Sequence, residues 1–502
     1  MQSETVSSET ESSGTVSSET GPRYRREHLF IGGDWRPSTA PGTLTVISPV
    51  TEQPVGEAPD TAPADVDAAV AAARRALTVS PWASWDGETR AAALDRFADA
   101  LERRAEETAR VVTAEMGMPI SVSGPVEGTG PARTLRYFAQ LARATPQEER
   151  RPAFPGPGTT VVRREPVGVV AVVVPWNFPQ SLMMFKVAPA LAAGCTIVVK
   201  PAPETVLDAF QLGDAAQEAG IPEGVVNVVT GGRETGAYLV AHPGVDKVAF
   251  TGSTEAGRTI GEVCGRLLRP ATLELGGKSA AIVLDDADLG QAVRGLAWAC
   301  LLNSGQTCYT SSRILAPRSR YSEVVDAVAA LAASLRVGDP SDPATRVGPL
   351  ASARQRDRVE SYIDAGRAGG ARVVAGGGRP AGLERGWFVE PTVFADVDNS
   401  AVVAREEIFG PVLVVIPYDD VDQAVAIADD SPYGLAGTVW TSDEDKGLEI
   451  ARRLRTGTVG VNFYNIDLGA PFGGVKASGL GRELGPEGLA AYVEHKSVYL
   501  RR

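Results

Sequence analysis

The sequence predicts an α/β protein built on parallel, doubly wound sheets. After residue 166, Val-rich segments with the pattern of strands buried on both faces alternate with helical segments. Such an alternation is typical of βαβ units. The pattern restarts after Leu273, which indicates a second α/β unit. The length of 502 residues allows about three units of ordinary domain size.

The N-terminal part is predicted to be a tail followed by a hairpin and helices. Residues 1–22 are mostly Ser, Glu and Thr, too polar to offset their chain entropy, and we predict a disordered tail over residues 1–26. The segment His28–Trp35 contains Gly-Gly-Asp, a hairpin signal. Helical periodicity then runs through Ala64–Leu77 and Glu88–Glu115.

The first α/β unit follows these helices. Pro166–Phe185 is apolar and long enough to raise the question of a transmembrane helix, but its central prolines favour a buried strand followed by a turn. Ligands of such sheets bind at the carboxyl ends of the strands. Strands are expected at Val167–Val174, Thr196–Val199, Val225–Val229 and Lys247–Phe250, with helices at Ser181–Ala193, Glu204–Ala219, Glu234–Ala241 and Glu255–Leu267.

The second α/β unit repeats the alternation over the C-terminal part of the chain. Its last segment, Ser497–Leu500, is predicted to pair with another strand or with another subunit. Strands are expected at Ala280–Leu284, Arg313–Leu315, Ala371–Val374, Phe388–Val393, Val412–Tyr418 and Gly437–Thr441, with helices at Leu289–Ser304, Tyr321–Leu335 and Asp422–Ala428.

Composition narrows the class of protein. Asp and Glu total 62 against 49 Lys and Arg, a net charge of -13. This balance argues against a nucleic-acid backbone or an anionic membrane surface as the main partner, and favours an acidic cytoplasmic protein. With only 4 Cys and 3 His, and no Cys-x-x-Cys pair, neither a disulfide framework nor a metal site is expected. No secretory signal is visible.

Cys308 is the cysteine for which the sequence suggests chemistry. It follows a small, polar turn at the end of a predicted helix, where a thiolate could be exposed. A nucleophilic cysteine needs a lowered pKa or an adjacent base. The alternative is a small buried hydrophobe, the usual state of a lone cysteine.

Two further segments suggest a site. Glu274 alternates with leucines and precedes two glycines, so it is either a surface partner of Lys278 or a general base in a cleft. In a chain with so few histidines, a carboxylate is the natural base. Phe250–Thr254 ends a strand and opens a helix, where free amides bind phosphate, but it departs from the GxGxxG fingerprint and is a weak signal.

A series of motifs carries a family resemblance. In their order and spacing they resemble the aldehyde dehydrogenase superfamily, from about residue 29 to the end of the chain. The motifs are Pro175-Trp176-Asn177-Phe178-Pro179, Lys200-Pro201, Phe250-Thr251-Gly252-Ser253, Leu273-Glu274-Leu275-Gly276-Gly277-Lys278, Gly305-Gln306-Thr307-Cys308, Glu406-Glu407-Ile408-Phe409-Gly410-Pro411 and Pro471-Phe472-Gly473-Gly474.

The resemblance implies an aldehyde dehydrogenase-like fold of two doubly wound α/β domains and a small β oligomerisation element. It places the dinucleotide-binding domain at residues 27–147 and 165–276, and the catalytic domain at residues 277–484. The oligomerisation element would comprise residues 148–164 and 485–502. Members of the family are usually dimers or tetramers, so a homodimer or homotetramer is expected.

The resemblance also implies a mechanism without coenzyme A. Cys308 would attack the aldehyde to give a thiohemiacetal, and Asn177 would stabilise its oxyanion. Hydride transfer to a nicotinamide leaves a thioester, which water activated by Glu274 would hydrolyse to the carboxylic acid. Lys186 matches a family lysine near the site, although a purely structural cation is an equal alternative.

The implied cofactor is NAD. Lys200 matches a ribose-binding lysine, and Glu204 lies one place after the position where strictly NAD-dependent members often carry a Glu. That displacement removes part of the repulsion of a 2′-phosphate, so tolerance of NADP is expected. Further cofactor contacts are expected from Trp176, Gly252, Ser253, Glu407 and Phe409.

The substrate is predicted to be an uncharged aliphatic or aromatic aldehyde. The expected pocket contains no Arg or Lys, so a carboxylated semialdehyde has no counter-charge. Asp467 is either a turn residue or a group that attracts a substrate hydroxyl or ammonium. The expected lining residues are Phe178, Leu182, Phe185, Leu302, Thr307, Tyr309, Asp467 and Phe472.

Three alternatives to this interpretation differ in the residues that they require. Transfer of the acyl group to coenzyme A would not need the base Glu274. A thiol amidase would need a histidine-like base for Cys308. A non-enzymatic dinucleotide-binding protein would have no physical need for Cys308, Glu274 and Asn177 together.

Overall fold

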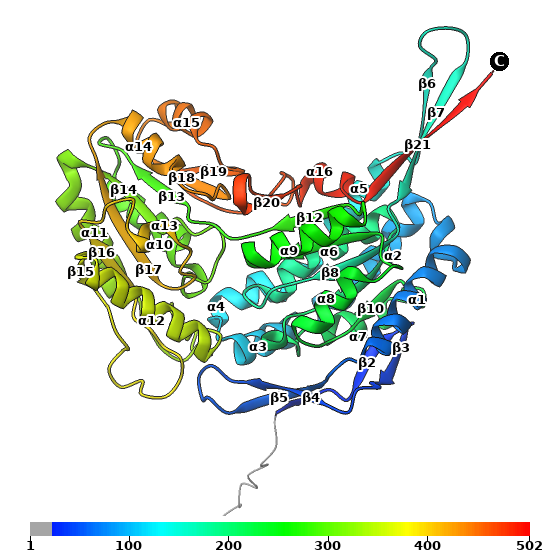
Figure 1. Ribbon diagram of the computed structural model, residues 1–502, viewed down its shortest axis with the longest axis horizontal. Coiled ribbons are helices and arrows are strands. Elements are labelled where there is room, and N and C mark those ends of the chain that lie inside the picture. Colours follow the sequence, from blue (N-terminus) through cyan, green and yellow to red (C-terminus); the bar gives the residue numbers. More distant parts are fainter. Residues whose placement is uncertain (1–22, 502) are drawn as a thin grey trace, which may run out of the picture.

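The structure, a computed structural model, describes residues 23–501. Figure 1 shows two α/β bodies side by side and a narrow β arm that projects from one of them. None of the helices in the described residues is long and apolar enough to cross a membrane. Most of the predicted disordered tail lies outside the described residues.

The larger body contains an eight-stranded sheet in the order β20-β12-β11-β8-β9-β10-β2-β3. Its middle strands, from β12 to β10, run parallel, whereas β20, β2 and β3 pair antiparallel at the two edges. The strands are β2 (His28–Ile31), β3 (Asp34–Pro37), β8 (Val169–Val173), β9 (Thr196–Lys200), β10 (Val226–Val228), β11 (Lys247–Thr251), β12 (Ala271–Glu274) and β20 (Gly479–Leu480).

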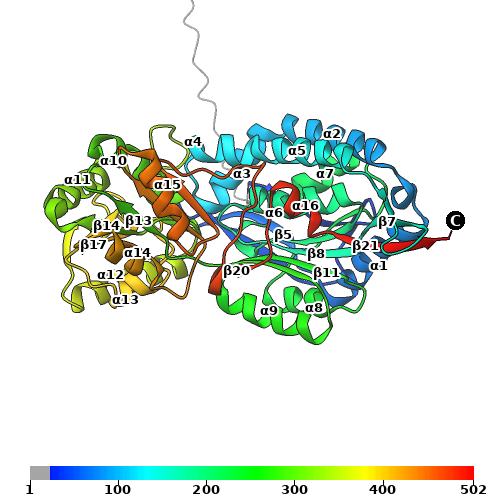
Figure 2. The same ribbon diagram turned by 90° about the horizontal axis from the view of Figure 1, so that it is seen from above.

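Helices cover both faces of this sheet, because successive strand residues point to opposite faces. Val170 and Val172 pack in one cluster, and Val169 and Ala171 pack in another. Figure 2 shows the two helical layers on either side of the sheet. The first layer comprises α2 (Gly87–Arg103), α5 (Gly130–Ala144), α6 (Pro179–Ala193) and α7 (Phe210–Glu218), and the second comprises α1 (Pro63–Val79), α8 (Arg233–Ala241) and α9 (Thr254–Arg266).

The smaller body contains a seven-stranded sheet in the order β15-β16-β17-β14-β13-β18-β19, parallel except for β15. The strands are β13 (Ala280–Val283), β14 (Arg313–Pro317), β15 (Arg372–Ala375), β16 (Thr392–Ala395), β17 (Val412–Tyr418), β18 (Ala436–Trp440) and β19 (Thr458–Val461). The helices around it are α10 (Leu289–Leu301), α11 (Tyr321–Ser334), α12 (Ala353–Ala368), α13 (Val402–Arg405), α14 (Val421–Asp429) and α15 (Glu444–Arg453).

The arm is a three-stranded antiparallel sheet in the order β21-β7-β6 (Figure 1). It pairs β21 (Val493–Leu500) with β7 (Thr159–Pro166), which pairs in turn with β6 (Glu148–Pro152). A second small sheet joins β1 (Tyr24–Arg25), β4 (Thr43–Ile47) and β5 (Pro54–Pro59), and the remaining helices are α3 (Ala105–Met116), α4 (Ile120–Ser123) and α16 (Gly485–Ala490).

The α/β fold class and the repeated strand–helix alternation are confirmed, but some boundaries differ. The end of the predicted tail is wrong, because Tyr24 and Arg25 pair in parallel with β5 and the Arg26 guanidinium lies 2.9 Å from the Asp214 carboxylate. The helical segment Glu88–Glu115 is two helices, which meet at Arg104.

Two predicted elements are shorter than expected for local reasons. In Glu204–Ala219 the α-helix begins only at Phe210, because the carboxylate of Glu115 accepts the N–H groups of Leu207 and Asp208. The strand predicted at Phe388–Val393 begins only at Thr392, directly after a proline that has no N–H to donate.

Candidate active site

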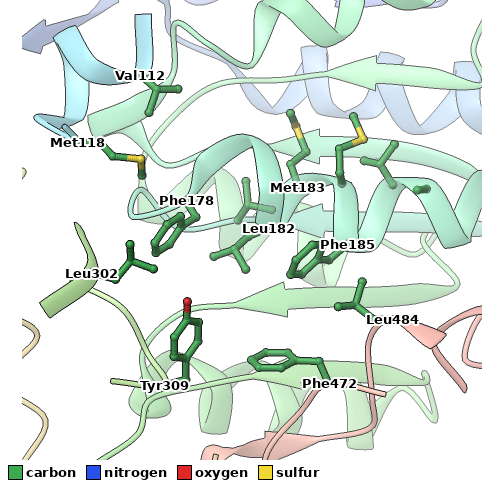
Figure 3. Packing of buried hydrophobic residues seen from close by; sticks show 14 of the residues in the cluster. Val112, Met118, Phe178, Leu182, Met183, Phe185, Leu302, Tyr309, Phe472 and Leu484 are labelled. Carbon is green, nitrogen blue, oxygen red and sulfur yellow. The ribbon is translucent and has the colours of Figure 1, made fainter. Parts of the chain in front are cut away.

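A cavity of about 250 Å³ lies between α5, α6, the Cys308 loop and the segment around residues 465–472. Figure 3 shows Phe178, which precedes α6, and Leu182 and Phe185 on α6 facing Tyr309 and Phe472 across a gap. Leu302 lies at one end of this gap in the same view. The structure brings together these predicted lining residues, which are Phe178, Leu182, Phe185, Leu302, Thr307, Tyr309 and Phe472.

Asp467 is the exception among the predicted lining residues. It is exposed and does not line the cavity, although its neighbours Ile466 and Leu468 do. Its Oδ1 accepts a hydrogen bond of 2.8 Å from the N–H of Gly469. The turn interpretation of Asp467 is therefore the one that the structure supports, since local backbone bonding occupies its carboxylate.

Arg133 makes the prediction of a pocket without a basic residue wrong. It lines the cavity from α5, and its Nη2 donates a hydrogen bond of 2.8 Å to the carbonyl of Pro125. Gly130, Arg133 and Thr134 stand at i, i+3 and i+4, so one face of α5 contributes this wall. The i, i+3, i+4 spacing is the signal in the sequence that could have predicted this wall of the cavity. The lining residues that were not predicted are Val126, Gly130, Arg133, Thr134, Ser181, Trp298 and Asn465.

Backbone geometry directs Cys308 into the cavity. The chain leaves α10 through Asn303, Ser304 and Gly305, all with positive φ. At Gly305 a Cβ would lie 2.2 Å from the carbonyl oxygen of Gly410, so the position requires glycine. Cys308 then lines the cavity with a half-buried side chain.

The surroundings of Cys308 keep its thiol protonated in this state. Burial raises the pKa of the Cys308 thiol, and the nearby carboxylates of Glu407 and Glu274 raise it further. Burial and these two carboxylates therefore favour the thiol form of Cys308 over the thiolate. Because the charges of Glu274 and Glu407 act on the pKa of the thiol, both carboxylates lie near the sulfur of Cys308.

Asn177 lies in the turn between β8 and α6. Its Nδ2 donates a hydrogen bond of 2.9 Å to the carbonyl of Gln306, and its own carbonyl accepts one of 2.8 Å from the Nδ2 of Asn303. These two bonds tie Asn177 to the loop that carries Cys308. The residue is only 2% exposed, and the two bonds hold its side-chain Nδ2 and its backbone carbonyl against that loop.

Glu274 ends β12 and is buried, with 3% of its surface exposed. Neither carboxylate oxygen has a hydrogen-bond partner among the described residues. Burial raises the pKa of Glu274 well above its usual value, and Glu483 raises it further while Lys186 and Arg482 oppose the shift. A surface pair with Lys278 is not formed, because Lys278 is buried and its Nζ has no partner in the described chain.

Lys186 makes a buried ion pair beside Glu274. Its Nζ lies 2.7 Å from the Oε1 of Glu483 and 2.5 Å from the Oγ1 of Thr251, and it also donates to the carbonyl of Leu182. Both members of the ion pair are at most 1% exposed. Lys186 therefore holds the charge of Glu483 next to Glu274.

Of the predicted cofactor residues, Trp176, Lys200, Gly252 and Ser253 lie at the carboxyl ends of β8, β9 and β11, whereas Glu407 and Phe409 come from the segment before β17. Trp176 and Phe409 pack edge to face, with their ring centroids 5.3 Å apart. The Oε1 of Glu407 accepts a hydrogen bond of 2.9 Å from the N–H of Gly277, and burial raises the pKa of Glu407 to about 7. Lys200 ends β9, and burial lowers its pKa to about 8.

The start of α9 offers an anion-binding geometry next to these groups. The Oγ of Ser253 caps the helix by accepting the N–H of Ala256, and Gly252 is bonded through its N–H to the carbonyl of Glu274. Unpaired amides in the first turn of a helix suit a diphosphate. The side chains predicted to bind ribose and the helix start predicted to bind diphosphate therefore occur in an order along the chain that fits a dinucleotide.

Glu204 of the larger α/β body pairs with a residue of the smaller one. Its Oε1 is 3.4 Å from the Nη2 of Arg354, which stands in the first turn of α12. The ion pair links the segment that is predicted to contact the cofactor to the smaller α/β body. Arg354 was not predicted, since it is 150 residues away in sequence and follows no recognised motif.

Comparisons with known proteins agree with this site. The family model described as "Aldehyde dehydrogenase family" matches residues 35–498. A geranial dehydrogenase from Castellaniella defragrans is 57% identical over 474 residues, which cover 94% of this chain and 98% of the relative.

Solved structures give the same result. A Mycobacterium tuberculosis aldehyde dehydrogenase complexed with NAD+ is 49% identical, with a TM-score of 0.92 over 95% of this chain and 98% of its own. A Pseudomonas syringae aldehyde dehydrogenase C mutant complexed with NAD+ and octanal is 39% identical, with a TM-score of 0.91 over 94% and 96%. The chain thus belongs to the aldehyde dehydrogenase family.

Proposed function

We propose that this enzyme oxidises an apolar aldehyde to the carboxylic acid with NAD+, through a covalent intermediate on Cys308. The observation that carries the proposal is the convergence of Cys308, Asn177 and Glu274. Cys308 lines the apolar cavity, Asn177 is bonded to the same loop, and the charge of Glu274 acts on the thiol.

The first step forms a carbon–sulfur bond. Cys308 gives up its thiol proton to water as the sulfur attacks the aldehyde carbon, and the carbonyl oxygen becomes an oxyanion. The Nδ2 of Asn177 and the N–H of Cys308 stabilise this charge. That N–H makes no bond to another residue in the described part of the chain, so it is free to donate. NAD+, held by Lys200, Glu407 and the start of α9, would supply the hydride acceptor needed to convert the adduct on Cys308 to a thioester.

The second step breaks the carbon–sulfur bond. Glu274 takes a proton from a water molecule, which attacks the thioester carbon and releases the carboxylic acid and the Cys308 thiol. Its oxygens are free for this task because no described side chain or amide holds them. Glu483 and Lys186 act on Glu274 through their charges, which raise and lower its pKa respectively.

The cofactor is NAD, and this chain has residues to hold each of its parts. We assign the ribose hydroxyls to Lys200 and Glu407, and the diphosphate to Gly252 and Ser253 at the start of α9. Trp176, Glu204 and Phe409 would complete the cleft. NADP is tolerated in this proposal, because Glu204 is engaged by Arg354.

The substrate class follows from the cavity walls. Phenyl, indole and branched aliphatic groups form most of the lining, which favours a medium-length or branched aldehyde without charge. The relatives that act on geranial or hold octanal, by their printed names, fit such a cavity.

The organisation of the enzyme is also proposed. Residues 27–147 and 165–276 would form the dinucleotide-binding domain, residues 277–484 the catalytic domain, and residues 148–164 and 485–502 the oligomerisation element. The arm exposes Phe154 and Tyr499, which are 98% and 81% exposed, and these side chains would be covered in a homodimer or homotetramer. A cytoplasmic location is expected. Light scattering of the full chain tests the oligomer.

A panel of aldehydes tests the proposed function. NADH absorbance is followed with propanal, octanal, geranial and benzaldehyde, each with and without coenzyme A. Efficient turnover of octanal or geranial without coenzyme A supports the proposal. Turnover only with coenzyme A, or none with any aldehyde, would contradict it.

A further inference from the structure

Glu127 is a buried carboxylate beside the active site that the proposed reaction does not use. It lies in the helical turn Gly124–Gly128 and is 0% exposed. Its Oε2 accepts hydrogen bonds from the backbone N–H groups of Gln180, at 2.7 Å, and Ser181, at 3.3 Å. The hydroxyl of Ser181 donates in return to the carbonyl of Val126, at 2.8 Å. Three hydrogen bonds thus tie this turn to the first turn of α6.

These bonds replace a cap that α6 does not supply itself. The helix begins at Pro179, and Phe178, which precedes it, offers no side-chain cap. The first N–H groups of a helix have no partner within it. Glu127 provides the missing acceptor from a separate segment, as a capping side chain does.

The first turn of α6 and the Glu127 turn form two walls of the aldehyde cavity. Phe178, Ser181 and Leu182 line one side, and Val126 and Gly130 line the other. Asn177, the proposed oxyanion donor, lies one residue before Phe178. A shift of α6 against the Glu127 turn would therefore change the cavity width and move the amide that holds the oxyanion.

We propose that Glu127 is a positioning residue for aldehyde oxidation, which fixes the separation of the two cavity walls and the place of the Asn177 amide. The inference rests on the proposed function, because it needs the cavity and Asn177 in the roles assigned above. Glu127 touches neither the aldehyde nor the cofactor in this assignment. It acts through the backbone of α6.

Glutamine is the conservative replacement at this position. Burial raises the pKa of Glu127 to about 8, while the N–H groups of Gln180 and Ser181, which donate to its Oε2, oppose the shift. The neutral carboxyl is therefore populated at pH 7, and its carbonyl oxygen can accept the same two bonds. In Glu127→Gln the amide oxygen can accept the same hydrogen bonds. Glu127→Ala removes the acceptor, and Glu127→Asp moves it away from α6 because the side chain is one methylene shorter.

The test compares two aldehydes on each variant. The ratio of kcat/KM for octanal to that for propanal does not depend on the fraction of active enzyme. We expect Glu127→Ala and Glu127→Asp to change this ratio by about fivefold or more and to slow the NADH burst, since misplacement by about 1 Å is costly to catalysis. Glu127→Gln should keep the ratio within about twofold of the parent.

Asp65→Ala is the matched control. Asp65 is also buried, at 5% exposed, and accepts the N–H of Ala62 at the start of α1, on the opposite face of the sheet. Its loss should lower thermal stability and leave the aldehyde ratio unchanged. If Glu127→Ala does not fold, Glu127→Asp supplies the same comparison.

An unchanged aldehyde ratio and burst rate in folded Glu127→Asp or Glu127→Ala would overturn the inference. So would an equal change of the ratio in Asp65→Ala. Failure of the proposed function would give a different result: the parent would form no NADH, or Asn177→Ala would keep its NADH burst. The inference about Glu127 would then fail together with the proposed function.

Discussion

The Nζ of Lys186 lies 2.7 Å from the Oε1 of Glu483, and the two side chains are 0% and 1% exposed. Glu483 follows a turn near the end of the chain, 297 residues after Lys186. Its charge raises the pKa of Glu274, and Lys186 opposes that effect. One buried ion pair therefore tunes the carboxyl group that we assign to water activation.

Breaking this ion pair should destabilise the protein strongly. Lys186→Met leaves the Glu483 carboxylate buried without its cation, and we expect a loss of about 3–5 kcal/mol in the free energy of unfolding. The double variant Lys186→Met, Glu483→Leu should recover much of the loss, because no buried charge remains. Urea denaturation of the three proteins checks this. A double variant as unstable as the single one would contradict the argument.

Substitutions at Cys308 and Glu274 should separate the two chemical steps. Cys308→Ala should abolish NADH formation and retain cofactor binding. Glu274→Gln should keep a rapid burst of about one NADH per site and lower the steady-state rate by about 100-fold or more, because acylation survives and hydrolysis fails. Stopped-flow absorbance at 340 nm measures both phases. Loss of the burst in Glu274→Gln would place Glu274 in the first step instead.

Cofactor choice should depend on Glu204. Glu204→Gln removes a carboxylate from the cleft and frees Arg354, so catalytic efficiency with NADP should rise by about three- to tenfold relative to NAD. Arg354→Gln should act in the opposite direction, because it frees Glu204 to repel a 2′-phosphate. The measurement is kcat/KM with each cofactor. A parent preference for NAD of several orders of magnitude would contradict NADP tolerance.

The affinity for NAD should pass through a maximum between about pH 7 and 8. Ribose hydroxyls donate to ionised Glu407, whose pKa is raised to about 7, so binding should strengthen as the pH rises through 7. Lys200, whose pKa is lowered to about 8, loses its charge above that pH and weakens binding again. Titration calorimetry from pH 6 to 9 measures this. Glu407→Gln should remove the acidic limb, and Lys200→Arg the alkaline limb.

Arg133 should influence charged aldehydes more than neutral ones. Its guanidinium lines the cavity, so a carboxylated semialdehyde gains an attraction that the sequence did not predict. Arg133→Ala should lower kcat/KM for a carboxylated aldehyde by about fivefold and leave octanal within about twofold. Asp467→Ala should change neither, since its carboxylate is bonded within its own turn. Equal losses on both aldehydes in Arg133→Ala would assign Arg133 a structural role.

The residues that we assign to catalysis could be singled out in the sequence because short motifs surround them. Cys308, Glu274 and Asn177 lie in contiguous segments whose glycines and prolines leave a readable signal. The central strands could be predicted for a similar reason, since Val169–Val173 and Thr196–Lys200 are continuous apolar runs buried on both faces.

Contacts between distant segments left no comparable signal. The carboxyl of Glu127 caps α6 from 53 residues away, and Arg133 reaches the cavity from a helix with ordinary amphipathic spacing. The helix α12 was not predicted because only Val359, Ile363 and Gly366 are buried along it. The raised pKa of Cys308 depends on burial by residues from several elements, which composition and spacing do not reveal.

Strand β20 closes one edge of the large sheet, and β21 closes the arm. Both come from the last part of the chain, although their partners, β12 and β7, are synthesised more than 200 residues earlier. A nascent polypeptide therefore leaves the ribosome with β12 and β7 as open edges until the end of translation. Truncated products would keep those edges exposed and prone to pair with one another, and the large sheet and the arm can be completed only after the last part of the chain has left the ribosome.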